Sequence, residues 1–74
     1  MATMTETERF ETLLTLEAAL ITARALAAHG IDADTRTRGA ADVAKISRES
    51  DELWAYLSNP AIDRFFTYRA AALA

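Results

Sequence analysis

The distribution of aromatic residues constrains the fold of this chain more than any other feature. Five of the six aromatic residues lie between Trp54 and Tyr68, on both sides of the segment Ser58-Asn59-Pro60. Proline disfavours helical geometry at the residue before it, and asparagine caps helices well. Large apolar side chains are therefore concentrated at a corner between two helices. We expect this corner to be either the structural hub of the protein or a docking surface.

The rest of the chain is also predicted to be helical. Only two glycines and one proline occur in 74 residues, and no alternation of apolar and polar residues continues long enough for a sheet. The expected helices cover residues 5–29, 40–58 and 60–73. We therefore predict an all-α fold, a small three-helix protein that forms a single domain over residues 1–74. Its first helix is long, and residues 1–4 are expected to be disordered.

Capping residues define the expected helix ends. Thr5 and Glu8 have the spacing of a capping box, in which each side chain bonds the backbone of the other residue, and Gly30 is expected in the left-handed conformation that stops a helix. Residues 31–38 are polar and are expected to form a solvated connection. Asn59 is expected to cap the third helix, with Pro60 at its first position.

The second helix shows a regular amphipathic pattern, with one apolar and one charged side. Its apolar stripe comprises Val43, Ile46, Ser50, Leu53, Trp54 and Leu57. Its opposite side carries Lys45, Arg48, Asp51 and Glu52. We expect the charged side to face solvent.

The other two helices carry charges inside their apolar stripes. The apolar arc of the first helix comprises Phe10, Leu13, Leu14, Leu20, Ile21, Ala25 and Ala28. Glu17 and Arg24 project from the middle of this arc, about 10 Å apart along the helix. Arg69 is similarly central in the stripe of the third helix, which comprises Ile62, Phe65, Phe66 and Leu73. Trp54, Phe65 and Phe66 are expected in the core. A buried and unpaired charge at such a position costs several kcal/mol, so we expect each charge to find a partner or reach water.

Two pairings satisfy these charges. In one, the first and third helices pack within a chain and Glu17 meets Arg69, while Arg24 extends its stem over apolar surface to reach water. In the other, the first helix packs antiparallel against its copy, with a two-fold axis between Leu20 and Ile21 that places Glu17 opposite Arg24 of the other chain. A solvated rim, or a site that holds a polar ligand, are the remaining alternatives for Glu17 and Arg24.

Composition disfavours several functional classes. The net charge of −3 and the pI of about 4.9 repel nucleic acid and anionic lipid, so we expect neither a nucleic-acid nor a membrane partner. The chain has no cysteine and one histidine, and we expect no metal and no cofactor. The acidic N-terminus and the charges within the apolar run argue against a secretory signal or a membrane span. A cytoplasmic location is therefore expected.

A few residues remain as weaker candidates. His29 with Asp32 and Asp34 lacks a second nitrogen or sulfur ligand for a metal, so a capping or surface histidine is the preferred interpretation. Residues 35–39, Thr-Arg-Thr-Arg-Gly, precede the expected second helix and can approach a phosphate, but they lack the glycine spacing of a P-loop. Tyr56 and Tyr68, with Arg64 and Arg69, have the composition of binding hot spots, although packing at the edge of the core is the alternative for both tyrosines.

These observations favour a non-enzymatic protein–protein interaction module, completed by oligomerisation or by another protein. The expected interface comprises Glu17, Leu20, Ile21, Arg24, Tyr56, Arg64, Tyr68 and Arg69. Seven arginines against one lysine, with many alanines, indicate a GC-rich bacterial or phage genome, so the preferred hypothesis is a regulatory, inhibitor, antitoxin-like or adaptor protein. The alternatives are a small dimeric transcription regulator, and a dimeric enzyme or ligand-binding protein whose inter-helix pocket uses Glu17, Arg24 and Arg69.

Overall fold

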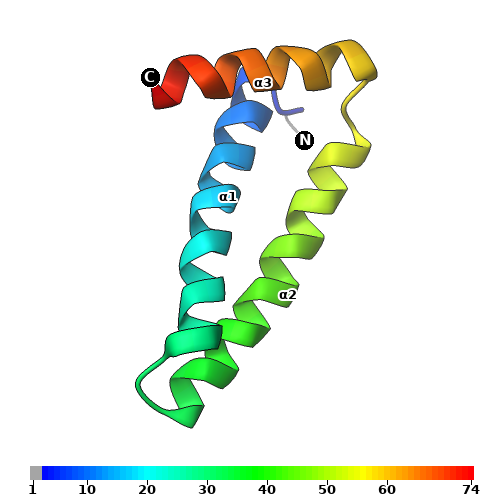
Figure 1. Cartoon of the computed structure of the whole chain (residues 1–74). Helices are drawn as coiled ribbons and strands as arrows, with labels where there is room; N and C mark the ends of the chain where they lie inside the picture. The colour runs from blue at the N-terminus through cyan, green and yellow to red at the C-terminus, as the bar shows by residue number, and fades with distance from the viewer. Residues whose placement is uncertain (1–2) are drawn as a thin grey trace.

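The computed structural model describes residues 3–74 as three α-helices joined by short links. The helices are α1 (Glu6–His29), α2 (Ala33–Ala55) and α3 (Asn59–Leu73). α1 and α2 form an antiparallel hairpin, and α3 runs across the open end of that hairpin (Figure 1). The predicted all-α, three-helix fold with a long first helix is confirmed. Residues 1 and 2, part of the segment expected to be disordered, lie outside the described residues.

The first helix begins as predicted but ends differently. The Thr5 hydroxyl accepts from the Glu8 backbone N–H at 3.1 Å, and Glu8 accepts from the Thr5 N–H at 3.3 Å, so the capping box is confirmed. The left-handed conformation predicted for Gly30 is wrong, because this residue is extended, with φ −57° and ψ 147°. Glycine is favoured there for space, since a Cβ would lie 2.6 Å from the Leu26 carbonyl oxygen.

The polar connection predicted over residues 31–38 is also wrong, because α2 begins at Ala33 rather than near Ala40. Asp32 caps the helix by accepting from the Thr35 backbone N–H at 2.7 Å. This hydrogen bond is the main reason that the pKa of Asp32 lies below its ordinary value. The polar residues that follow are an exposed first turn of helix, so the link between α1 and α2 shortens to three residues.

Gly39 lies inside α2, where it allows the hairpin to close. It is buried, and a Cβ on it would lie 2.6 Å from the Ala27 backbone nitrogen and 3.0 Å from the Ala23 carbonyl oxygen. Ala23 is buried at the same contact. Small residues on both helices therefore bring the two backbones close together in this half of the hairpin.

The corner between α2 and α3 differs from the prediction by a few residues. α2 ends at Ala55 rather than Ser58, and the Tyr56 N–H donates to the Leu53 carbonyl oxygen at 3.1 Å. Ser58, not Asn59, caps α3 by accepting from the Ala61 N–H at 3.3 Å. Pro60 lies in the first turn as expected. The chain therefore turns within three residues, and the aromatic side chains on its two sides come together.

The aromatic corner is the structural hub of the protein. Its buried centre comprises Phe10, Leu13 and Phe65, with Leu14, Leu53, Trp54, Leu57 and Tyr68 packed around it. The Phe65 ring lies 5.5 Å from the Phe10 ring and 5.1 Å from the Trp54 ring, centroid to centroid. Phe66, predicted to be in the core, is 50% exposed, because neighbouring positions on a helix point about 100° apart. Phe65 points into the hub, whereas Phe66 lies at its edge, with its ring centroid 6.1 Å from that of Trp54.

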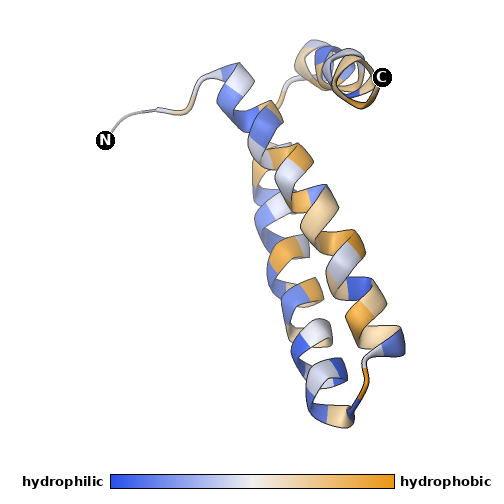
Figure 2. Ribbon diagram, turned by 90° about the vertical axis from the view of Figure 1, so that its left-hand side faces the viewer, coloured by the Kyte–Doolittle hydropathy of each residue, from blue (hydrophilic) through white to orange (hydrophobic). Residues whose placement is uncertain are grey.

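The apolar stripe of α2 is half-buried along its length, and Lys45, Arg48, Asp51 and Glu52 are exposed as predicted. The stripe of α1 divides into two parts. Phe10 and Leu13 are buried beneath α3, whereas Ile21, Ala25 and Ala28 are exposed. Figure 2 shows α3 nearly end-on, with apolar segments of α1 continuing away from it along the hairpin. α3 therefore covers only the first part of this stripe.

Candidate interaction surface

Two ion pairs attach α3 to α1. Arg64 binds Glu6 through two hydrogen bonds, from Nε to Oε1 and from Nη2 to Oε2, each 2.7 Å long. These hydrogen bonds are the main cause of a lowered pKa at Glu6 and a raised pKa at Arg64. Arg64, one of the predicted interface residues, is therefore occupied within the chain. Its contact with a partner stays a prediction.

The second ion pair joins Glu17 to Arg69, as in the intrachain pairing expected from the sequence. Arg69 Nε lies 3.0 Å from Glu17 Oε2, and the side chains keep 42% and 31% of their surface exposed, respectively. The Nε atom is buried but is not aligned for a hydrogen bond with the carboxylate. The contact therefore supplies charge neutralisation with incomplete hydrogen bonding, and the exposed part of Glu17 remains open to a second cation.

Beyond this ion pair, one side of α1 is largely uncovered. Leu20 is half-buried, Ile21 is 69% exposed and Arg24 is exposed. With Glu17 and Arg69 they line an open depression of about 240 Å³. No carboxylate of residues 3–74 lies within ion-pair distance of Arg24. We call the surface formed by these five residues the Leu20 face.

A second depression continues from the Leu20 face toward the link between α1 and α2. It has a volume of about 350 Å³ and is lined by Arg24, Ala27, Ala28, Ala40 and Val43. Arg24 lines both depressions, so together they form one surface that is mostly apolar. Sequence reasoning missed the contribution of α2 to this surface, although Ala40 and Val43 lay within the expected second helix, because the sequence did not show how closely α1 and α2 pack. The alanines at positions 27, 28 and 40 were the available signal, since small side chains leave a hollow between packed helices.

The Leu20 face brings together the three charges of the expected ligand pocket, but the shape differs from an enclosed site. Small-molecule sites are clefts of roughly 300–1,000 Å³ that bury most of their ligand. The depression on the Leu20 face is smaller, and both Ile21 and Arg24 on its wall are exposed. This geometry favours contact with another surface over enclosure of a small molecule.

The structure separates the two tyrosines of the predicted interface. Tyr68 packs against the hub, with its ring centroid 5.6 Å from that of Phe10. Tyr56 follows the last residue of α2 and is 75% exposed. Of the two, Tyr56 has the ring that is accessible to a partner, and both contacts stay predictions.

The weaker candidates of the sequence find ordinary structural roles. His29 is exposed in the last turn of α1. Arg36 donates to the Gly30 carbonyl oxygen at 2.9 Å, and Arg38 pairs with Asp34 at 3.0 Å on the exposed side of α2. Residues 35–39 lie within a helix rather than before one, so the loop position from which they were expected to approach a phosphate is wrong. Among residues 3–74, no group of three or more metal-ligating side chains is positioned to hold an ion.

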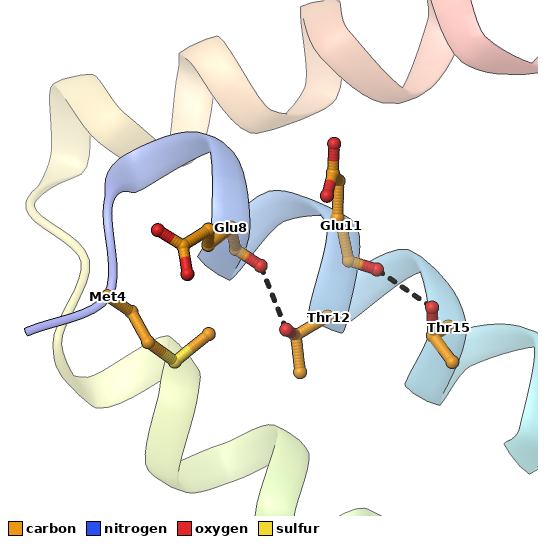
Figure 3. A pocket seen from close by; sticks show the side chains of 5 residues that line it. All are labelled: Met4, Glu8, Glu11, Thr12 and Thr15. Atoms are coloured by element: carbon orange, nitrogen blue, oxygen red, sulfur yellow. Dashed lines mark hydrogen bonds between the residues drawn. The ribbon is translucent and has the colours of Figure 1, made fainter. Parts of the chain in front are cut away.

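A further hollow lies beside the start of α1, where sequence reasoning expected nothing. It has a volume of about 380 Å³ and is lined by Met4, Glu8, Glu11, Thr12 and Thr15 (Figure 3). The hydroxyls of Thr12 and Thr15 donate to the backbone carbonyls of Glu8 and Glu11 at 2.8 and 3.0 Å. Glu8 also closes the capping box. Most polar groups of this hollow are therefore used by the helix itself, and the Leu20 face is the stronger candidate.

The comparisons with known proteins are negative. No protein-family model, no curated protein and no solved structure matches this chain. Within residues 3–74, none of the helices combines the length and the apolar character needed to cross a bilayer. The functional interpretation therefore depends on the geometry of the chain itself.

Proposed function

We propose that this chain is a protein–protein interaction module whose Leu20 face binds another protein surface. The observation that carries the proposal is the position of Ile21 on the apolar stripe of α1, 69% exposed between the charges of Glu17 and Arg24. An apolar centre with charged residues at its rim is the usual composition of a protein interface. The apolar centre supplies affinity, and the charges supply specificity.

The exposed area of the molecule supports this proposal. The chain exposes 5328 Å², about 800 Å² more than the roughly 4,500 Å² expected for a compact monomer of its mass. Its radius of gyration is 14.3 Å, against about 11 Å for a compact 74-residue domain. A typical stable interface buries about 800 Å² on each partner. The open shape therefore leaves enough surface for one interface.

The proposed biological role is that of a bacterial or phage regulator, inhibitor, antitoxin-like protein or adaptor in the cytoplasm. Such proteins act by occupying the surface of another protein, which requires an accessible apolar face and no reaction chemistry. The exposed stripe of α1 provides such a face. A nucleic-acid role is less favoured, since Arg38 already pairs with Asp34 and the chain is acidic.

Photo-crosslinking in the native cell tests the proposal. A photoreactive amino acid replaces Ile21 on the Leu20 face, and in a matched chain it replaces Ile31, which is 96% exposed in the link between α1 and α2. We expect protein adducts from position 21 and few from position 31. The adducts should also disappear when Leu20→Asp is added. Equal yields at both positions, or adducts that survive Leu20→Asp, would reject the Leu20 face as an interface.

A further inference from the structure

We propose that the partner of the Leu20 face is a second copy of this chain, which packs its own α1 across it in the opposite direction. The two-fold axis lies between Leu20 and Ile21. In this arrangement Glu17 of each chain meets Arg24 of the other. This inference rests on the proposed interaction function and adds the identity of the partner.

Charge complementarity is the first support. Positions 17 and 24 lie about 5 Å on either side of the axis along the helix, so a single two-fold rotation brings both Glu17–Arg24 pairs together. Glu17 already neutralises Arg69 through Oε2 but keeps 31% of its side-chain surface exposed. Arg24 makes no ion pair within residues 3–74. One free cation and one accessible carboxylate on the same face are thus self-complementary, as a two-fold interface requires.

The intrachain and interchain pairings considered from the sequence are therefore compatible. Glu17 has two oxygens, and a carboxylate can accept from more than one guanidinium. Arg69 approaches one oxygen, and Arg24 of the second copy approaches the exposed part of the same group. Because Arg69 Nε has no aligned acceptor, the Glu17 carboxylate does not accept a hydrogen bond from it, and its acceptor capacity remains open to Arg24 of the second copy.

The area and the shape are the second support. The whole chain exposes about 800 Å² more than a compact monomer of its mass, and this excess is close to the share of one partner in a typical interface. Because α3 lies across the first turns of α1, the second helix has to cross α1 at an angle rather than run along it. Helix pairs in globular proteins commonly cross at about −50°. Such a crossing centres on Leu20 and Ile21 and leaves α3 in place.

Sedimentation equilibrium of the full chain tests the inference over the micromolar to high micromolar range. We expect a reversible increase in mass to twice the 8.1 kDa of one chain. Ile21→Asp should abolish the increase, whereas Ile31→Asp, the same substitution at a site far from the axis, should leave it unchanged. Both isoleucines are largely exposed, and the helical circular dichroism of each variant checks that it is folded.

Charge exchange tests the register. Arg24→Glu should raise the dimer dissociation constant by on the order of tenfold, because both symmetric pairs become repulsive. Arg48→Glu changes the net charge equally on the exposed side of α2 and should have no effect. A second chain carries Glu17→Arg with Arg69→Glu, which preserves its intrachain pair in reversed order. Each altered chain should self-associate poorly, and a mixture of the two should form the heterodimer.

Four results would overturn this inference. The first is a chain that stays monomeric at high micromolar concentration. The second is a dimer that tolerates Ile21→Asp. The third is the failure of the two charge-exchanged chains to associate when they are mixed. The fourth is a crosslink from position 21 to a different protein in the native cell, with no adduct between two copies. That fourth result would leave the proposed interaction function standing, whereas the absence of any specific adduct would remove both.

Discussion

Replacement of Phe65 by alanine gives the sharpest test of the hub. Its side chain is 0% exposed and its ring centroid lies within 5.7 Å of those of Phe10, Trp54 and Phe66. Truncation of a buried phenylalanine costs about 3–5 kcal/mol through lost burial and the cavity left behind. A 74-residue domain has a total stability of about 4–11 kcal/mol. Phe65→Ala should therefore remove at least a quarter of the free energy of unfolding, and up to all of it.

The adjacent Phe66 supplies the matched control. It is 50% exposed, so Phe66→Ala removes about half of the roughly 1.5–3 kcal/mol that full burial of a phenylalanine contributes, and it creates no closed cavity. We expect a loss of about 1 kcal/mol. The two variants delete the same atoms from neighbouring positions of one helix, so their difference reports which side of α3 faces the hairpin.

Urea denaturation measures both values, with Trp54 fluorescence and far-ultraviolet circular dichroism as probes. The Trp54 ring lies 5.1 Å from the Phe65 ring, so its emission reports directly on the hub. The experiment is run at concentrations where the midpoint does not depend on protein concentration, which excludes a contribution from association. Phe65→Leu, with a smaller expected loss, is measured in parallel in case Phe65→Ala does not fold. Equal losses for Phe66→Ala and Phe65→Ala would refute the assignment of Phe65 as the centre of the hub.

Three further substitutions test individual contacts. Gly39→Ala should destabilise the chain by about 1–3 kcal/mol in urea denaturation, because the added Cβ would press on the Ala27 backbone. This loss is expected although alanine favours helices, and a gain in stability would contradict the close contact between α1 and α2. The lowered pKa of Glu6 means that its pair with Arg64 stabilises the fold above about pH 4.5 and is lost as the pH falls through the lowered value. The wild type should thus lose more stability than Glu6→Gln on acidification, and parallel pH profiles would contradict this. Asp32→Ala should fray the helix over residues 33–38, which NMR chemical shifts would detect, whereas Asp32→Asn should not, because asparagine also caps helices. Unchanged chemical shifts in both variants would argue against the cap.

Structural features that depend on residues close together in the sequence could be predicted from it. The Thr5 and Glu8 capping box needs only two side chains at a fixed spacing, and the start of α1 was predicted within one residue. The amphipathic pattern of α2 was also sufficient to separate its exposed charges from its stripe. The aromatic cluster indicated the hub, because five large rings around one short turn have few other places to be buried.

The errors arose where a residue type has two structural uses. The sequence predicts Gly39 next to a helix boundary, but its role is to allow close approach to Ala23 and Ala27, which only the packed hairpin reveals. The polar composition predicts Asp32 in a loop, yet its side chain caps α2 and the polar residues after it form helical turns. The apolar stripe predicts both Phe65 and Phe66 in the core, but the direction of α3 decides which of these two adjacent rings is covered.

The same direction of α3 explains why a candidate interface exists at all. The 24 residues of α1 extend over about 36 Å, whereas a helix that crosses them covers only about its own diameter of 10–12 Å. Had α3 run along α1, its stripe of Ile62, Phe66 and Leu73 could have covered Leu20 and Ile21. Because it crosses instead, it buries Phe10 and Leu13 and reaches Glu17 through Arg69. It leaves open the side of the next two turns of α1 that carries Leu20 and Ile21. The uncovered apolar surface is thus a consequence of helix direction, and a partner that crosses α1 beyond Arg69 would repeat there the packing that α3 provides at the hub.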